Sequence, residues 1–80
     1  MQGPEEFNAL TETEQHTAIL EGTFLADREE NGLFVQLYSL HNFYIERWYD
    51  PAANRILKLQ AFDGTARLAP YIAPIKFNPR

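Results

Sequence analysis

The chain contains two histidines, His16 and His41, and no cysteine, so side chains that bind metals or act as nucleophiles are scarce. Glu12 and His16 lie four positions apart, which places them on one face of a helix. A protein metal site needs three or four such ligands, and this pair supplies two. We therefore interpret Glu12 and His16 as a surface pair and expect no metal site.

Nucleophilic catalysis would have to use Ser39, the one serine of the chain, together with His41 and an aspartate. Ser39 lies next to a predicted turn, where serine is common because its hydroxyl bonds to nearby backbone. The four glycines, at positions 3, 22, 32 and 64, are too scattered to form a phosphate-binding loop. These residues predict neither a catalytic triad nor a nucleotide site.

Glu46 is the remaining candidate for acid–base chemistry, because strand alternation puts it on one face with Tyr44 and Trp48. Burial between two aromatic rings would raise the pKa of its carboxyl group and suit it as a general acid. A cross-strand ion pair with Lys58 or Arg55 explains the same glutamate more simply, and we favour it. The sequence therefore predicts a protein that is not an enzyme and has no cofactor.

Length and charge restrict the class of protein further. Eighty residues, 45% of them hydrophobic, predict one small globular domain over residues 1–80. The net charge of −4 argues against nucleic-acid binding, which needs a basic surface. Residues 1–30 hold eight acids and Arg28 as their only base, whereas residues 31–80 have a net charge of +3. This split fits attraction between the two halves of one fold, or an acidic face for a basic partner.

The sequence also bears on location. No stretch approaches the roughly 20 apolar residues that a membrane-spanning helix requires, so no membrane association is expected. The first residues carry neither the basic start nor the apolar run of a signal peptide. The chain has no cysteine with which to form a disulfide, so these features together indicate a cytoplasmic protein.

The first third of the chain predicts a single helix. Residues 1–9 are expected to be a flexible lead-in. Thr11 and Glu14 have the spacing of a capping box, which begins a helix of about ten residues. Ile19 and Leu20 would form its apolar stripe, and Gly22 is expected to end it in the left-handed conformation.

Four predicted strands follow, at residues 23–29, 33–40, 43–50 and 55–62. Asn31-Gly32 is a strong hairpin signal, and every connection is too short for a parallel crossover. A short helix is then expected to begin near Ala66 or later and end before Pro74, with Pro70 in its first turn. The predicted fold class is α+β, with an N-terminal helix, a four-stranded antiparallel β-meander and a short C-terminal helix.

The predicted strands do not divide into one apolar and one polar face. Both faces carry large apolar side chains, and two short helices cover about one of them. The other face would be a larger aromatic surface than monomers usually expose. We predict that this surface, with Tyr38, Tyr44 and Trp48, is the binding site. The register stays open, because a one-residue bulge exchanges the two faces.

A pattern of short apolar segments runs through the middle of the chain, from Glu21 to Ala26, from Leu37 to Glu46 and into Tyr49-Asp50. In this pattern the chain resembles short uncharacterised bacterial proteins with a helix, a β-meander and a closing helix. The resemblance spans roughly residues 10–75 and implies the same fold. It implies no activity, cofactor or site residue.

Two functions are consistent with an aromatic sheet face. The first is a non-enzymatic protein-interaction module that binds itself as a homodimer, or another protein, through Tyr38, Tyr44 and Trp48. The alternative is a small-ligand-binding domain with a pocket between sheet and helices, bordered by Tyr44, Trp48 and the C-terminal helix. Neither function requires nucleic acid, a membrane or a cofactor.

Overall fold

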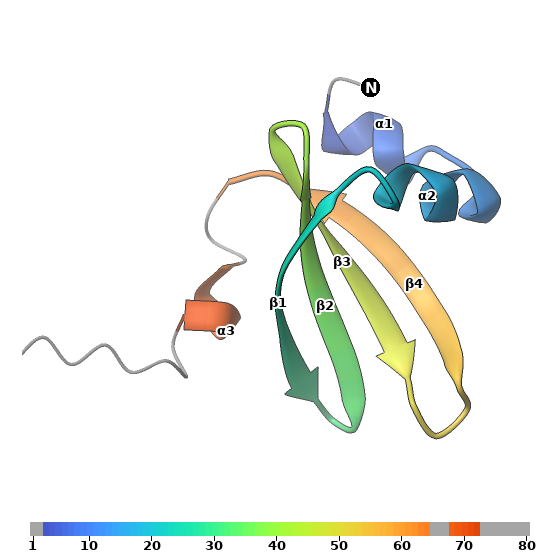
Figure 1. Ribbon diagram of the computed structural model, residues 1–80, viewed down its shortest axis with the longest axis vertical. Coiled ribbons are helices and arrows are strands. Elements are labelled where there is room, and N and C mark those ends of the chain that lie inside the picture. The colour runs from blue at the N-terminus through green and yellow to red at the C-terminus, as the bar shows by residue number, and fades with distance from the viewer. Residues whose placement is uncertain (1–2, 65–67, 73–80) are drawn as a thin grey trace, which may run out of the picture.

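The structure is a computed structural model that describes residues 3–64 and 68–72. It contains two short helices, a four-stranded sheet and a third helix (Figure 1). In chain order the elements are α1 (Pro4–Asn8), α2 (Glu12–Ile19), β1 (Thr23–Glu30), β2 (Leu33–Leu40), β3 (Phe43–Asp50), β4 (Arg55–Phe62) and α3 (Ala69–Ile72). The predicted α+β class is confirmed.

The four strands form one antiparallel sheet in the order β1-β2-β3-β4. Asn31 and Gly32 form the first hairpin turn, with φ values of 53° and 83°. Positive φ at both central residues is what a type I′ turn requires. The bounds predicted for the last three strands are confirmed, and β1 is one residue longer than predicted. Turn residues therefore define this meander.

The expectation that residues 1–9 are a flexible lead-in is wrong for α1. Pro4 begins this helix, a position where its missing amide proton costs nothing. Phe7 of α1 is 0% exposed and packs between the helices and the sheet. A single aromatic residue within a polar, acidic segment gives little periodic signal, yet its burial is enough to fix the helix on the sheet.

Asn8 ties α1 to the outer edge of β4. Its side-chain amide donates to the Ala61 carbonyl at 3.0 Å, and the Ala61 amide donates to Asn8 Oδ1 at 2.8 Å. The two bonds reproduce the pairing that a neighbouring strand would make. Asn8 thus satisfies backbone groups that an edge strand otherwise leaves open.

The capping box of α2 is confirmed, since the Thr11 and Glu14 side chains each accept a hydrogen bond from the other residue's backbone amide. The predicted apolar stripe is wrong at Leu20, which is 81% exposed because the helix ends at Ile19. Gly22 does not have the predicted left-handed conformation. Instead it lies so close to β2 that a Cβ atom would be 2.8 Å from the Ser39 carbonyl oxygen.

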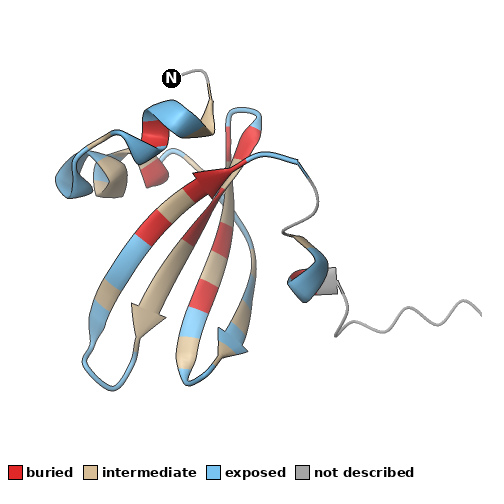
Figure 2. Ribbon diagram, turned by 180° about the vertical axis from the view of Figure 1, so that it is seen from behind, coloured by how far each residue is buried: buried red, intermediate tan, exposed pale blue. Residues whose placement is uncertain are grey.

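The two faces of the sheet are covered by different elements. On the face that we call the helix side, α1 and α2 bury one half of the sheet around Phe7, Ile19, Leu40, Phe43, Ile45, Leu59 and Ala61. On the opposite face, the α3 side, a smaller cluster contains Leu37, Phe62 and Tyr71. Figure 2 shows that the hairpin ends far from α1 and α2 are exposed or only half-buried.

One-residue bulges in both edge strands settle which residues share a face. Leu25 has no partner in β2, and the register of β4 against β3 shifts at Leu57. The second bulge brings Ile56 to the helix side, where it packs against the core. Both bulged leucines are exposed. A bulge reverses the side-chain direction of the residues beyond it in the same strand. The structure was therefore needed to assign the residues beyond each bulge in β1 and β4 to a face of the sheet.

The closing helix α3 lies inside the predicted limits, with Pro70 in its first turn. It follows β4 in the chain, yet it lies beside β1, at the other edge of the sheet (Figure 1). Tyr71 is buried in the α3-side cluster, with Leu68 half-buried beside it.

Candidate functional site

The three residues predicted to form the site do not share one face. Tyr44 lies opposite Ser39 and Tyr38 lies opposite Ile45, so Tyr38 and Tyr44 project from opposite sides of the sheet. Tyr44 and Trp48 are together on the α3 side, where Tyr44 stacks on Phe62 at 5.7 Å between ring centroids. Tyr38 lies on the helix side. The predicted site is therefore divided into two surfaces.

The first surface is the half of the helix side that α1 and α2 leave uncovered. It carries four aromatic side chains, Phe24, Phe34, Tyr38 and Tyr49, which we call the aromatic patch. Phe24 and Phe34 are 51% and 41% exposed. The ring of Phe34 is nearly parallel to that of Tyr49, at 6.5 Å, and Phe24 meets Tyr38 edge-on at 5.6 Å. These rings pack on one another and still present apolar surface to solvent.

Arg47 provides a cation in the middle of the aromatic patch. Its Nε donates to Gln36 Oε1 at 2.7 Å and its Nη2 donates to the Tyr38 hydroxyl, also at 2.7 Å. No carboxylate pairs with Arg47 among the described residues. Asp27 of β1 lies in the same cross-strand row, two strands away, and is exposed. Glu29, opposite Phe34, is a second exposed acid on this face. Among the described residues, Arg47 forms an ion pair with neither Asp27 nor Glu29.

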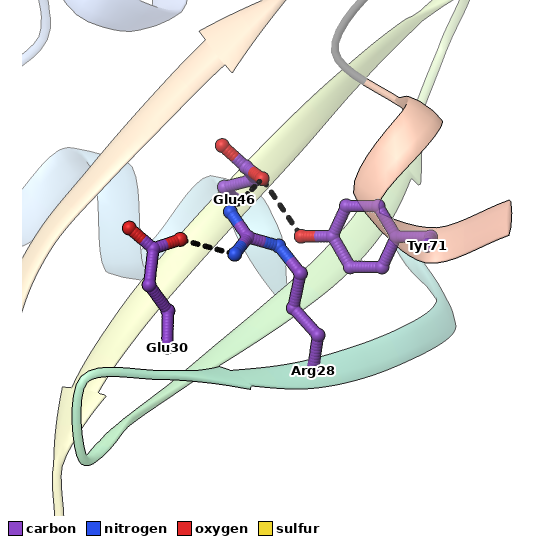
Figure 3. A network of polar contacts seen from close by, with 4 residues as sticks. All are labelled: Arg28, Glu30, Glu46 and Tyr71. Atoms are coloured by element: carbon purple, nitrogen blue, oxygen red, sulfur yellow. Dashed lines mark hydrogen bonds and ion pairs between the residues drawn. The ribbon is translucent and has the colours of Figure 1, made fainter. Parts of the chain in front are cut away.

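The second surface surrounds Glu46, whose side chain is buried on the α3 side at 1% exposure. The Tyr71 hydroxyl donates to Glu46 Oε2 at 2.7 Å, and Arg28 Nη2 donates to the same oxygen at 3.4 Å. Arg28 also forms an ion pair with Glu30 (Figure 3). Because Glu46 is paired with Arg28 and Tyr71, the expected cross-strand pair with Lys58 or Arg55 is not what the structure shows.

Lys58 and Arg55 take other positions along β4. Lys58 lies opposite Trp48 and places its ammonium 4.8 Å from the centroid of the indole ring. Arg55 lies opposite Asp50, at the end of the sheet. The Lys58 contact is a cation–π interaction, which stabilises an exposed lysine by about 0.5–1 kcal/mol.

The Arg28 guanidinium is held between two aromatic rings. Its central carbon lies 5.5 Å from the Trp48 ring centroid and 5.2 Å from that of Tyr71. Burial lowers the pKa of Arg28, but interactions with Glu30 and Tyr71 outweigh this effect and raise it above its ordinary value. Arg28 therefore stays charged and balances the buried Glu46 carboxylate.

Tyr71 is the group of this cluster whose protonation is altered most clearly. Burial, together with its hydrogen bond to the Glu46 carboxylate, raises the pKa of the Tyr71 hydroxyl well above its ordinary value. Tyr71 is consequently a neutral hydrogen-bond donor over the whole physiological range. Its role in the cluster is to bind the carboxylate, and a phenolate base is not available here.

The candidates for metal binding and acid–base chemistry lie in separate places, Glu12 and His16 on α2 and Glu46 on β3. His16 lies 4.0 Å from Glu12 on the surface of α2, as expected for a surface pair. No group of three metal-ligating side chains occurs in residues 3–64 and 68–72. No pocket is detected in the same part of the structure. The Glu46 carboxylate is covered by Tyr71 and so offers no room for a substrate.

Sequence reasoning missed Arg28 and Tyr71 as partners of Glu46. One signal was present for Arg28, because it is the only base among the first 30 residues and stands in a strand of acids. Its position opposite Val35, on the α3 side, follows from the two-residue turn at Asn31-Gly32. No signal linked Tyr71 to Glu46, since they are 25 residues apart and belong to elements of different type.

Two further observations concern the chain as a whole. Among the described residues, no helix combines the length and apolar character that a membrane crossing requires. Comparison of the chain with protein-family models, with curated proteins and with solved structures found no match in any of the three.

Proposed function

We propose that this protein is a non-enzymatic interaction module that forms a homodimer through the aromatic patch. The observation that carries the proposal is the exposure of Phe24 and Phe34 on a face whose other half is a buried core. Exposed aromatic clusters of this kind are enriched at protein interfaces. The proposal replaces the predicted site of Tyr38, Tyr44 and Trp48 by residues that share one face.

Charge placement favours a second copy of the chain as the partner. A twofold axis parallel to the strands and above β2 would place β1 of each copy over β3 of the other. Rotation about this axis keeps each residue at the same height along the strands. Asp27, Gln36 and Arg47 lie in one cross-strand row, so Asp27 of one copy would lie over Arg47 of its partner. Phe34 would lie against the partner's Phe34. Packed sheets are about 10 Å apart, a distance that an aspartate and an arginine span together.

The test is solution mass by size-exclusion chromatography with light scattering, measured over a wide concentration range. We expect a mass approaching twice the 9.3 kDa of the chain as concentration rises. Phe34→Ser should abolish the dimer, whereas Leu20→Ser, which changes a more exposed apolar residue outside the patch, should not. A monomer at every concentration, or equal behaviour of the two variants, would contradict the proposal.

A charge-reversal pair tests the orientation of the two copies. Asp27→Arg should weaken dimerisation, because it replaces an ion pair between the two copies by two like charges. Combining Asp27→Arg with Arg47→Asp should restore part of the affinity of the dimer. Asp63→Arg makes the same charge change at an exposed position outside the patch and is the matched control. If Asp27→Arg and Asp63→Arg behave alike, Asp27 does not face Arg47 in the dimer.

The small-ligand alternative has no geometric support from the described residues, because no pocket lies between the sheet and its helices there. Trp48, which was expected to border such a pocket, packs against the side chains of Arg28 and Lys58 instead. We therefore do not carry the alternative further.

A further inference from the structure

Tyr71 attaches α3 to the sheet through its buried side chain. Within this helix, Tyr71 is buried, whereas Ala69 and Pro70 are exposed. Leu68, just before the helix, is half-buried beside it. The Tyr71 ring enters between the Arg28 guanidinium and an apolar wall that includes Leu37. The described contacts of this segment with the sheet therefore centre on one inserted tyrosine ring, with Leu68 beside it.

The place that receives Tyr71 is selective for a neutral hydroxyl group. Its floor is the buried Glu46 carboxylate, which accepts the Tyr71 hydrogen bond at 2.7 Å. Arg28, the guanidinium beside it, is already paired with Glu30. A phenol adds no charge next to the Glu46 carboxylate. A phosphorylated tyrosine would bring two more negative charges next to Glu46 and be excluded.

Two buried hydrogen-bond donors at the same place have no acceptor among the described residues. They are Arg28 Nε and Trp48 Nε1. Buried polar atoms are satisfied in the great majority of native structures. The Tyr71 ring of α3 lies against the Arg28 guanidinium, but the described part of α3 supplies no hydrogen-bond acceptor to either donor. A bound segment with main-chain carbonyls at this place would supply the acceptors that α3 lacks.

We propose that Arg28, Glu46 and Trp48 form a binding site for a tyrosine-bearing segment of a partner protein, which α3 occupies within the chain through Tyr71. The partner segment carries an unphosphorylated tyrosine that donates its hydroxyl to Glu46, with an apolar residue three positions earlier in the place of Leu68. It displaces α3 because it reaches donors that α3 does not. This site lies on the α3 side and is independent of the aromatic patch.

The experiment uses the full-length Tyr71→Ala variant and a synthetic peptide with the sequence of residues 68–72. Trp48 is the only tryptophan of the chain, so its fluorescence reports directly on the site. We expect the peptide to bind the variant saturably, and the wild-type chain more weakly because the tethered Tyr71 competes. A peptide with phenylalanine in place of tyrosine should bind the variant about tenfold more weakly. A phosphotyrosine peptide should not bind.

Equal binding of the tyrosine and phenylalanine peptides would overturn the proposal, as would binding of the phosphotyrosine peptide or no binding to a folded variant. Circular dichroism establishes whether Tyr71→Ala is folded. If it is not, the wild-type chain is titrated with the same peptides by nuclear magnetic resonance. The tyrosine peptide should then shift the resonances of Trp48 and Ala69 and the phenylalanine peptide should not. Absence of that difference rejects the site.

Discussion

Glu46 is at the centre of a buried polar cluster whose members come from the first strand, the third strand and the last helix. A carboxylate with 1% exposure is stable only when charge and hydrogen bonds compensate for its lost hydration. Arg28 and Tyr71 provide this compensation from two directions. The cluster therefore links β1 and α3 to the central strand β3.

Removing the Glu46 carboxylate should show how much this side chain contributes to the free energy of unfolding. We expect Glu46→Ala to lower the free energy of unfolding by about 3 kcal/mol, because it leaves the Arg28 charge without its buried partner. Urea denaturation followed by Trp48 fluorescence measures the change. Glu29→Ala, at an exposed acidic position of the same strand as Arg28, should stay within about 0.5 kcal/mol of wild type. If both variants lose a similar amount of stability, Glu46 contributes no more to folding than an exposed glutamate does.

The raised pKa of Tyr71 predicts a loss of stability in alkaline solution. Because its folded-state pKa lies above that of the unfolded chain, its stabilising effect is complete below about pH 10 and is lost as the pH rises further. Tyr71→Phe should cost about 1.5–3 kcal/mol at neutral pH. The difference between wild type and this variant should shrink above about pH 10. A difference that is constant with pH would show that the hydroxyl is not buried against Glu46.

At the scale of the elements, Gly22 and Gly32 are required for different structural reasons, although nothing in the sequence distinguishes them. Gly32 needs a positive φ of 83°, which asparagine also adopts. Gly22 has an ordinary φ and is required because β2 passes within contact distance of its Cα. We expect Gly32→Asn to cost less than about 1 kcal/mol and Gly22→Asn about 1–3 kcal/mol, from the forced shift of backbone. Thermal unfolding of the two variants compares them directly, and equal costs would refute the distinction.

The Asn8 bridge makes a prediction about local opening. Asn8→Ala removes both bonds to Ala61 and should lower stability by about 1–2 kcal/mol. The Ala61 amide should also exchange its proton faster in Asn8→Ala than in the wild-type chain. Asn8→Asp keeps the acceptor and loses the donor, so it should protect this amide only in part. Unchanged exchange at Ala61 in Asn8→Ala would mean that the bridge is not formed in solution.

The limits of prediction from the sequence also lie at this scale. Strands could be bounded correctly because their turns carry local signals such as Asn31-Gly32. The faces of the edge-strand residues beyond the bulges at Leu25 and Leu57 could not be predicted, because these bulges leave no mark in composition. The opposite directions of Tyr38 and Tyr44 do not depend on a bulge, since β2 and β3 pair in one register from their two-residue turn. Contacts such as Tyr71 with Glu46 arise from tertiary packing, which local propensity does not encode.

For the whole molecule, the unequal covering of the two faces predicts that stability depends on concentration. If the aromatic patch is buried in a homodimer, the folded state is favoured by mass action and the melting temperature rises with protein concentration. The rise should be absent in Phe34→Ser and present in Leu20→Ser. Differential scanning calorimetry at several concentrations provides the measurement. A melting temperature independent of concentration in the wild-type chain would argue against a dimer that is populated at equilibrium.

The bridge between Asn8 and Ala61 has a consequence for how the protein is made. Residues 53 positions apart must meet before α1 can dock on β4. At translation rates of roughly 5–20 residues per second, the first helix leaves the ribosome about 3–10 seconds before its partner strand. During that interval Phe7 has no core to enter and is available to chaperones that bind apolar segments. The nascent chain therefore completes its main core only after most of the protein has been synthesised.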